Sequence, residues 1–375
     1  MIQPEMTALS SREMTDKLIA GQTLLPETLT LSLPGIAIRF STNSLILLTE
    51  LKQYFQPWIS DTQPHPAIDV IAIEQPVLQL DVPWKEWKRE PGKQGRKEAY
   101  CDLPDGRLIQ KVRTGMVFLQ NPTYRVAAGP CEKNPNQVIN FINNQYMTAL
   151  QQDDWVICHA AALNKGNRTI GFAGFSGGGK STSMLHLLAD PELAFLTNDR
   201  LFIKRDGSGV TARGVPKLPR INPGTIVNNT NLSSIISKRQ RDNFLSMPKD
   251  ELWQLEEKYD VDIAACFGEG KLAKEGHITD FIILNWSHRS DQATHIQSVS
   301  IKDRPQLLDA IMKSSGPFFQ RKDGSFNNDS QRLNPESYIQ ALHGVNIVEV
   351  SGGVDFQILT DYCRNLLGEK SEETQ

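Results

Sequence analysis

Cysteine is scarce in this 375-residue sequence, and the five that occur are scattered. None stands in a Cys-x-x-Cys pair, and their number is odd. Disulfide frameworks use even numbers of cysteines, and structural zinc sites use closely spaced ones. The sequence therefore argues against both and fits a reducing compartment, so we expect the protein in the cytoplasm.

Long apolar runs are also missing. No stretch of about 18 consecutive apolar residues occurs, and residues 1–22 lack the basic start and apolar centre of a signal peptide. We therefore expect no transmembrane helix and no membrane partner.

Neither sign of charge dominates the chain. The 40 Lys and Arg residues stand against 43 Asp and Glu residues, for a net charge of −3. Proteins that bind nucleic acid through bulk electrostatics are usually more basic, so no nucleic-acid partner is expected. Hydrophobic residues make up 39% of the chain, which is enough for one or two cores and excludes disorder as the main state.

The apolar pattern predicts two domains, which the chain length also allows. We expect an N-terminal α+β domain over 1–152, an α/β domain over 153–368 and a polar tail over 369–375. The boundary is set by the polar stretch Gln151–Asp154, which follows apolar residues at helical spacing over Asn136–Leu150.

A basic segment, 84–119, interrupts the first domain. Turn signals at Pro91-Gly92 and Asp105-Gly106 predict a loop followed by a β-hairpin. Its lysines and arginines indicate either a solvated hairpin face or an anion-attracting surface that faces a phosphorylated ligand. RNA binding by residues 84–113 is a weaker alternative, because aromatic residues at stacking spacing are missing.

The most specific motif is a phosphate-binding loop. Residues Gly174–Ser181 match Gly-x-x-x-x-Gly-Lys-[Ser/Thr] in full, after the apolar run Thr169–Ala173 and before a helical pattern. In such a loop, backbone N–H groups point at phosphate oxygens, and glycines leave room for the approach. A glycine-rich turn that only mimics the pattern is the alternative. The residues expected to bind the nucleotide are Gly174, Phe175, Ser176, Gly177, Gly178, Gly179, Lys180, Ser181 and Thr182.

Two residues of this loop carry specific chemistry. Lys180 is expected to neutralise charge on the β- and γ-phosphates, and the Ser181 hydroxyl to bind Mg²⁺. The sequence lacks the Asn-Lys-x-Asp motif of GTPases and the Leu-Ser-Gly-Gly-Gln-like signature of ATP-binding cassettes.

A carboxylate and an imidazole complete the candidate site. Asp199 follows an apolar run 18 residues after Ser181, and we expect a crossover helix to bring it to a parallel strand beside the loop. There it would hold Mg²⁺ or accept a proton from an attacking hydroxyl, whereas a turn aspartate is the alternative. His159 is expected on the strand that pairs with the strand of the loop, either packed or facing the γ-phosphate.

These motifs, in this order, resemble the catalytic domain of HPr kinase/phosphorylase, whose nucleotide site is similar to that of phosphoenolpyruvate carboxykinase. More closely, LTNDRLFI (196–203) and GVPKLPRINPGT (214–225) resemble the bacterial HprK-related kinase B family. The first half of the chain contains further stretches that resemble this family: REPGK (89–93), GRKE (95–98), KVRTGM (111–116), GPC (129–131) and NQVINFIN (136–143). The resemblance implies an α/β fold: a P-loop kinase domain of HPr kinase/phosphoenolpyruvate carboxykinase type with an N-terminal α+β domain.

The resemblance also implies roles. The loop would hold ATP, Ser181 and Asp199 would bind Mg²⁺, Asp199 would be the base, and His159 and Lys180 would lie near the transferring phosphoryl group. The sequence departs from the HPr kinase pattern where the first of two adjacent aspartates is Asn198 and where Thr211 stands for a metal-binding glutamate. These departures argue against a second metal contact and against a reverse, phosphorylase reaction.

The proline-rich segment 213–224 is basic as well. It is either a rigid connecting loop or a pre-ordered grip on the γ-phosphate or an anionic acceptor. Substrate contacts are therefore expected from Arg213, Lys217 and Arg220.

The sequence thus predicts an ATP-dependent phosphotransferase that moves the γ-phosphoryl group to a hydroxyl acceptor with the help of Mg²⁺. The acceptor is a protein serine, a peptide or a small metabolite, and the sequence does not distinguish among the three. The first domain is expected to help to select the acceptor. An ATP-dependent binding or switch module with little transfer is the alternative. The resemblance also makes a homo-oligomer an expectation.

Overall fold

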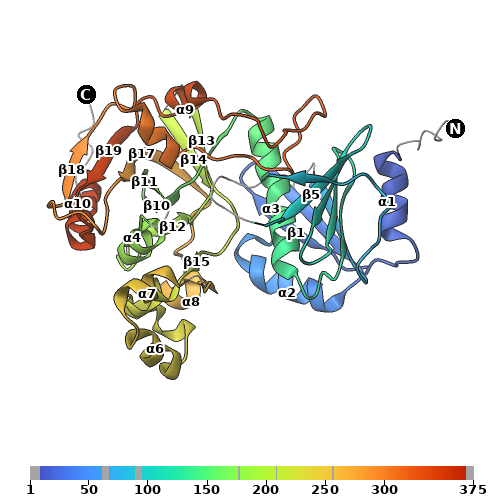
Figure 1. The fold of residues 1–375 in the computed structure, drawn as a ribbon, viewed down its shortest axis with the longest axis horizontal. Coiled ribbons are helices and arrows are strands. Elements are labelled where there is room, and N and C mark those ends of the chain that lie inside the picture. Colours follow the sequence, from blue (N-terminus) through green and yellow to red (C-terminus); the bar gives the residue numbers. More distant parts are fainter. Residues whose placement is uncertain are drawn as a thin grey trace. The chain divides into compact units, whose positions relative to one another are not determined.

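The structure is a computed structural model that describes residues 9–60, 67–88, 95–175, 178–207, 209–255 and 257–368. Over these ranges the chain is a mixed α/β protein with several sheets (Figure 1). It divides into two compact units. The first contains residues 1–154 and 314–332, and the second contains 155–313 and 333–375.

The first unit is built on one sheet. Its strands in chain order are β1 (Leu29–Leu33), β2 (Ile36–Thr42), β3 (Ala67–Glu74), β4 (Lys85–Trp87), β5 (Glu98–Asp102), β6 (Arg107–Lys111), β7 (Val117–Gln120) and β8 (Arg125–Gly129). Their order across the sheet is β1-β2-β3-β8-β7-β6-β5-β4. The pairs β2–β3 and β3–β8 are parallel, and the other neighbours are antiparallel.

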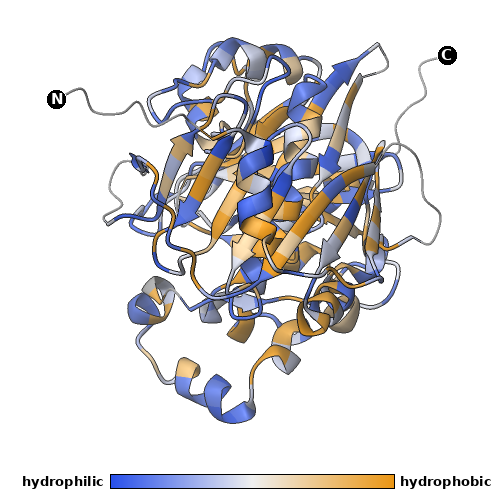
Figure 2. Cartoon of the chain, turned by 90° about the vertical axis from the view of Figure 1, so that its right-hand side faces the viewer, coloured by the Kyte–Doolittle hydropathy of each residue, from blue (hydrophilic) through white to orange (hydrophobic). Residues whose placement is uncertain are grey.

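Helices α1 (Ser11–Ile19), α2 (Leu45–Phe55) and α3 (Pro135–Gln152) accompany this sheet. Helix α1 begins with a capping box between Ser10 and Glu13, and its apolar face joins a cluster of buried residues on β7 and β8. The helix expected over Asn136–Leu150 is confirmed as α3. In Figure 2 many of the central strands are orange, the colour of hydrophobic residues.

Residues 314–332 belong to the first unit, although the sequence analysis assigns them to the second domain. The reason is a buried arginine. The Arg107 side chain, 3% exposed, donates to Asp102 Oδ1 at 2.6 Å and to the carbonyl oxygens of Pro317 and Asn327 at 3.3 and 2.8 Å. Its guanidinium also lies 4.5 Å from the centre of the Phe326 ring. One cation therefore binds this segment to the sheet through polar and aromatic contacts.

The basic segment 84–119 contains β4 to β7, as the expected hairpin requires. Pro91-Gly92 and the REPGK stretch lie outside the described residues, and so does the tail 369–375. The two least exposed of the paired basic side chains in the segment are Arg107, which pairs with Asp102, and Lys111, which pairs with Glu98. The ion pairs of these two cations stabilise the fold of the first unit.

The second unit is built on a larger sheet. Its strands are β9 (Val156–Cys158), β10 (Ala161–Lys165), β11 (Arg168–Gly174), β12 (Ala194–Thr197), β13 (Leu201–Asp206), β14 (Gly209–Gly214), β17 (Glu275–Leu284), β18 (His295–Ser298) and β19 (Asn346–Ser351). The main order is β12-β10-β11-β17-β14-β13-β9, and β19 pairs with both β17 and β18. The beginning of β17 pairs with β14, and its later part pairs with β11 and β19. The long strand β17 thus joins two parts of the sheet.

The strand expected to run beside β11 is displaced by one position. Strand β12 is antiparallel to β10, and β10 is antiparallel to β11. Strand β12 is therefore parallel to β11, but the hairpin partner β10 lies between them. The expectation that the two strands are direct neighbours is wrong, because the short turn between β10 and β11 places β10 next to β11.

Helices of the second unit are α4 (Lys180–Leu187), α5 (Pro223–Val227), α6 (Lys238–Leu245), α7 (Lys249–Gln254), α8 (Ile263–Phe267), α9 (Pro335–Ala341) and α10 (Phe356–Gly368). A small two-stranded sheet pairs β15 (Arg220–Ile221) with β16 (Tyr259–Asp260). None of the helices in the described part of the chain is long and apolar enough to cross a membrane.

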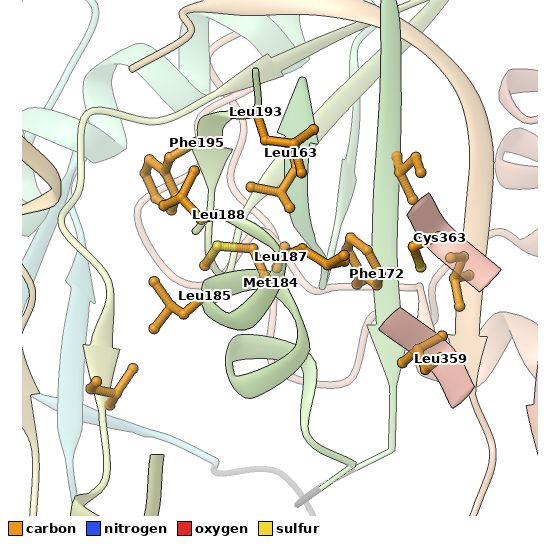
Figure 3. Close-up of a cluster of buried hydrophobic side chains, with 14 of the residues drawn as sticks. Leu163, Phe172, Met184, Leu185, Leu187, Leu188, Leu193, Phe195, Leu359 and Cys363 are labelled. Atoms are coloured by element: carbon orange, nitrogen blue, oxygen red, sulfur yellow. The ribbon is translucent and has the colours of Figure 1, made fainter. Parts of the chain in front are cut away.

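Helix α4 is fixed by an apolar cluster (Figure 3). One side of the helix packs on the sheet, and Figure 3 shows Leu359 and Cys363 of α10 beyond Phe172 of β11. Burial of each large aliphatic side chain contributes about 1.5–3 kcal/mol, so the cluster holds α4 firmly against the sheet. The α4 residues in the cluster are Met184, Leu185 and Leu187, followed by Leu188, and they face Leu163, Phe172 and Phe195.

We expect Arg107→Ala to lower the free energy of unfolding of the first unit by about 2–4 kcal/mol, because it removes a buried cation and leaves its acceptors on Asp102, Pro317 and Asn327 without their donor. Urea unfolding measures the effect. Arg39→Ala is the matched control: Arg39 also pairs with an aspartate at 2.6 Å, but both side chains are at least 40% exposed, and such pairs contribute about 0–1 kcal/mol. Equal effects of the two substitutions would contradict the structural role of Arg107.

Candidate active site

A tight glycine turn connects β11 to α4. Gly179 caps α4 at φ = 81°, a left-handed conformation that favours glycine. A Cβ atom on Gly178 would lie 2.9 Å from the carbonyl oxygen of Phe175, so a side chain there would clash. Ser176 and Gly177 of the predicted motif lie outside the described residues. The described part of the turn fits the close approach of an anion to backbone N–H groups at the start of a helix.

Lys180 folds back over this turn. Its Nζ donates to the carbonyl oxygen of Gly174 at 3.1 Å. Burial lowers the pKa of Lys180, the charge of Asp199 opposes that shift, and the charge of Lys313 adds to it. The amine is therefore partly withdrawn from water and lies within the electrostatic range of the carboxylate.

The two hydroxyl residues after Lys180 differ in their surroundings. Ser181 lies partly exposed in the first turn of α4. The Thr182 Oγ1 atom instead lies 2.9 Å from Thr225 Oγ1 of α5. Thr182 thus links the start of α4 to the start of α5, and Ser181 is the hydroxyl available at the glycine turn.

His159 and Asp199 each lie where the chain passes between the two parts of the sheet. His159 lies in the break between β9 and β10, and Asp199 lies in the break between β12 and β13. Strand β9 pairs with β13, with Cys158 opposite Leu201, and β10 pairs with β12. The two breaks are therefore adjacent. The expectation that His159 is part of a regular strand is wrong, and the break explains why its side chain is 38% exposed rather than packed.

A third segment joins these two breaks. The His159 N–H donates to the carbonyl oxygen of Ile311 at 2.7 Å. The Tyr338 hydroxyl accepts from the Lys313 N–H at 3.1 Å and donates to the carbonyl oxygen of Ile157 at 2.7 Å. One backbone hydrogen bond and two hydrogen bonds of the Tyr338 hydroxyl therefore place Lys313 beside the end of β9.

The Asp199 carboxylate is the centre of the site. Its Oδ1 lies 3.3 Å from His159 Nε2 and 3.4 Å from Lys313 Nζ, and its Oδ2 lies 3.8 Å from Arg200 Nε. Burial alone would raise the pKa of Asp199, but the hydrogen bond from His159 and the charges of Lys313 and Arg200 hold it well below its usual range. Asp199 is therefore ionised at neutral pH.

Lys217 and Arg220 add positive charge to the same region. Burial, followed by the charge of Arg200, lowers the pKa of Lys217 to about 8, and the charges of Arg220 and Lys313 act in the same direction. Arg220 itself pairs with Asp260 at 3.0 Å across β15 and β16. Lys217 and Arg220 are thus electrostatically coupled to the residues around Asp199.

Arg213 has other partners. Its Nε donates to Glu275 Oε2 at 3.1 Å, and its guanidinium lies 4.4 Å from the centre of the Trp155 ring. These contacts stabilise the pairing of β14 with β17. The partners that the structure gives for Arg213 are therefore Glu275 and Trp155, whereas those of Asp199 are His159, Lys313 and Arg200.

Several polar atoms at this place are buried and lack a hydrogen-bond partner within the described part of the chain. They are a donor, Arg200 Nη1, and two acceptors, Asn198 Oδ1 and Asn222 Oδ1. Asn222 directly precedes α5, which contacts α4 through Thr225. Buried polar groups without partners are rare and costly. A ligand with acceptor oxygens, such as a triphosphate, would supply a partner for Arg200 Nη1, whereas the two asparagine oxygens require a hydrogen-bond donor.

Magnesium also fits the available residues. No group of three or more His, Cys, Asp and Glu side chains suited to a metal occurs in the described ranges. Mg²⁺ usually takes only one or two protein carboxylates and completes its shell with phosphate oxygens and water. Ser181 and Asp199 would therefore hold it together with a bound nucleotide.

Lys313 is the residue that the sequence analysis misses. It lies 114 residues from Asp199 in the chain, outside any recognisable motif. Arg200 carries a weak signal, because it directly follows Asp199 at the start of a strand.

We expect the Lys217 side chain to titrate with a midpoint near pH 8, and NMR of ¹³C,¹⁵N-labelled lysine measures it. An unfolded chain binds more protons than the folded one between about pH 8 and the usual lysine value of 10.5, so stability rises with pH across this window. Asp199→Asn should move the midpoint further down, because the charge of Asp199 raises it, whereas Asp242→Asn on α6 should not. A midpoint above pH 10 would contradict the cationic cluster.

Comparisons with known proteins add little to this geometry. No family model matches the chain, and no curated protein matches it. Among solved structures, the chain is similar to the Hpr(Ser) kinase/phosphatase from Coxiella burnetii, with 11% identity and a TM-score of 0.28, over 56% of this chain and 95% of that chain. A score this low shows neither a shared fold nor shared chemistry, so the chemistry of the site has to be inferred from its own residues.

Proposed function

We propose that the second unit is an ATP-dependent phosphotransferase, a P-loop kinase of HPr kinase type that moves the γ-phosphoryl group to a hydroxyl acceptor. The observation that carries this proposal is the ionised Asp199 carboxylate, held between His159 and Lys313 within electrostatic range of Lys180. A kinase needs a phosphate cradle, cations for the transferred group and one carboxylate for the acceptor hydroxyl. A glycine turn, several cations and one ionised carboxylate in the second unit support the proposal.

The glycine turn and Lys180 would bind the β- and γ-phosphates, and Ser181 and Asp199 would hold Mg²⁺, which neutralises phosphate charge when bound. Asp199 would orient the acceptor hydroxyl and take its proton. His159 would keep Asp199 in place and lie near the transferred group.

Lys313, Arg200 and Lys217 would neutralise the charge that moves with the phosphoryl group. Arg200 supports this role best, because its buried Nη1 lacks a hydrogen-bond partner among the described residues. A phosphoryl oxygen would supply that partner.

The acceptor would be a protein serine, a peptide or a small hydroxylated metabolite, and the first unit would help to select it. We also propose a cytoplasmic location, a homo-oligomeric state, and no nucleic-acid or membrane partner. Deleting residues 1–154 and 314–332 together, and finding the same acceptor preference, would contradict the role of the first unit.

A second candidate is an ATP-dependent binding or switch module with little transfer. The observation that favours it is the presence of Asn198 beside the single carboxylate Asp199, with no larger acidic or histidine cluster in the described ranges. In such a module the nucleotide would order a partner surface.

We expect Asp199→Asn to lower transfer of ³²P from labelled ATP by at least about 100-fold, because the hydroxyl loses its proton acceptor, while ATP still binds. Lys180→Ala should abolish both binding and transfer, and Lys165→Ala, which removes a lysine at the far end of β10, should change neither. Fractionated cell lysate supplies the acceptor in this assay, and titration calorimetry measures ATP binding.

The two candidate functions give opposite outcomes. Normal transfer by Asp199→Asn would remove Asp199 from the mechanism. Nucleotide binding and partner capture without transfer, in the wild type and in Asp199→Asn alike, would support the switch module.

We expect Lys313→Gln to slow phosphoryl transfer by about 10- to 100-fold, since it removes one cation beside the transferred group. The same substitution should raise the pKa of Asp199, because Lys313 helps to hold that pKa down. Carboxyl ¹³C NMR measures the pKa, and the exposed Lys302→Gln is the control. An unchanged rate together with an unchanged pKa would contradict the assigned place of Lys313.

A further inference from the structure

The chain crosses between the two units at three points. These crossing points are 154–155, 313–314 and 332–333. Lys313 is therefore the last residue of the second unit before the chain enters the first unit again. Whatever holds Lys313 beside Asp199 has to act on Lys313 itself or on the residues that precede it.

One hydroxyl group is bonded close to all three crossing points. The Tyr338 hydroxyl, on α9, donates to the carbonyl oxygen of Ile157 at 2.7 Å. It also accepts from the Lys313 N–H at 3.1 Å and lies 3.4 Å from the Lys313 carbonyl oxygen. Ile157, Lys313 and Tyr338 each lie within about five residues of one crossing point. The second-unit ends of the three connections are thus linked to one another at a single oxygen atom.

This hydroxyl is buried. Tyr338 is 3% exposed and belongs to the apolar cluster that also contains Cys158 and Ile311. Burial raises the pKa of Tyr338, so its hydroxyl keeps the proton that it donates to Ile157. Hydrogen bonds in such a low-dielectric place are stronger than in water. The two bonds therefore hold the Lys313 N–H in a fixed place relative to β9.

The residues just before Lys313 are attached to the same strand end. Met312 forms an antiparallel bridge with Cys158, and the Ile311 carbonyl oxygen accepts from the His159 N–H at 2.7 Å. Tyr338 extends this attachment by one residue, to the main chain of Lys313 itself. The approach to Lys313 is therefore ordered up to the residue whose side chain carries the charge.

The position of that charge matters for the proposed reaction. Lys313 Nζ lies 3.4 Å from Asp199 Oδ1, at the end of a flexible four-carbon side chain. A cation stabilises a transferred phosphoryl group best when it is held in place beforehand. A misplacement of about 1 Å is able to slow a reaction by about 100-fold. A fixed main chain limits the places that the ammonium group reaches.

From these contacts we infer that Tyr338 is a positioning residue for phosphoryl transfer. Its hydroxyl fixes the main chain of Lys313 at the point where the chain leaves the second unit, so that the ammonium group stays beside Asp199. The inference rests on the proposed function, because it requires Lys313 to act on the transferred group. Tyr338 acts through Lys313 alone.

Transfer of ³²P from labelled ATP by the full chain tests the inference, with fractionated cell lysate as the source of acceptor. Tyr338→Phe removes the hydroxyl and keeps the ring. We expect kcat to fall about tenfold, because Lys313 is no longer held in place, and KM for ATP to stay unchanged. Tyr146→Phe, which removes the hydroxyl of a buried tyrosine on α3 in the first unit, should change neither constant.

The double variant Tyr338→Phe/Lys313→Gln shows whether Tyr338 acts through Lys313. Once Lys313 has lost its charge, the hydroxyl has no cation left to position. We therefore expect the double variant to transfer phosphate at the rate of Lys313→Gln alone. Losses that multiply would show that Tyr338 affects transfer by another route and would overturn the inference.

Hydrogen exchange of the Lys313 amide, followed by NMR, tests the link without nucleotide or activity. In the wild type this amide should exchange at least about tenfold more slowly than in an unstructured chain, since it is bonded in a buried place. Tyr338→Phe should remove this protection. The Leu342 amide, which donates to the Tyr338 carbonyl oxygen at 2.9 Å, should keep its protection and thereby show that α9 is folded. Fast exchange of the Lys313 amide in the wild type would overturn the inference without any variant.

The inference and the proposed function fail in different ways. Transfer that falls in Lys313→Gln but is normal in Tyr338→Phe would overturn the positioning role of Tyr338 and leave the proposed function intact. No transfer by the wild type with any lysate fraction would overturn the proposed function and, with it, the positioning role.

Discussion

The second unit depends on one electrostatic constraint, a single carboxylate that is surrounded by cations. Asp199 contacts His159, Lys313 and Arg200 directly, and the charges of Lys180 and Lys217 act on the same small region. The cations exceed the carboxylate in number, and partial burial makes their mutual repulsion costly. A bound anion would offset this excess of positive charge. Burial is the largest cause of the lowered pKa of Lys180 and of Lys217, and the neighbouring cations add to it.

Backbone topology creates this cluster. Two strand breaks, β9–β10 and β12–β13, lie side by side because each break passes from one part of the sheet to the other. Side chains in regular strands alternate between faces, but residues in a break are not bound by that alternation. His159 and Asp199 are therefore able to face the same point. The segment that ends at Lys313 is attached to the end of β9 through the His159 N–H and through the Tyr338 hydroxyl, so hydrogen bonds to its main chain set the position of the cation.

The sequence predicts the parts of the site that are local in the chain. The glycines, Lys180 and the helix after them form one continuous motif, and a carboxylate after an apolar run is a recognisable signal. The strand breaks are less visible, because WVICHAAAL is apolar on both sides of His159 and looks like one strand. Lys313 carries no local signal, since long-range backbone pairing alone brings it to Asp199. Residues 314–332 join the first unit for a similar reason, the buried partner Arg107 far away in sequence.

The low pKa of Asp199 bears on the kind of base that Asp199 would be in the proposed reaction. A strong general base has a pKa near the working pH, and Asp199 is far below it. Phosphoryl transfer, however, passes through a loose transition state in which the acceptor hydroxyl keeps its proton until late. An ionised carboxylate that orients the hydroxyl is then sufficient, and in the proposed reaction the same cations that depress its pKa would neutralise the phosphoryl oxygens. The cation cluster therefore favours phosphoryl transfer over reactions that require early removal of a proton, for which a carboxylate with a raised pKa would be needed.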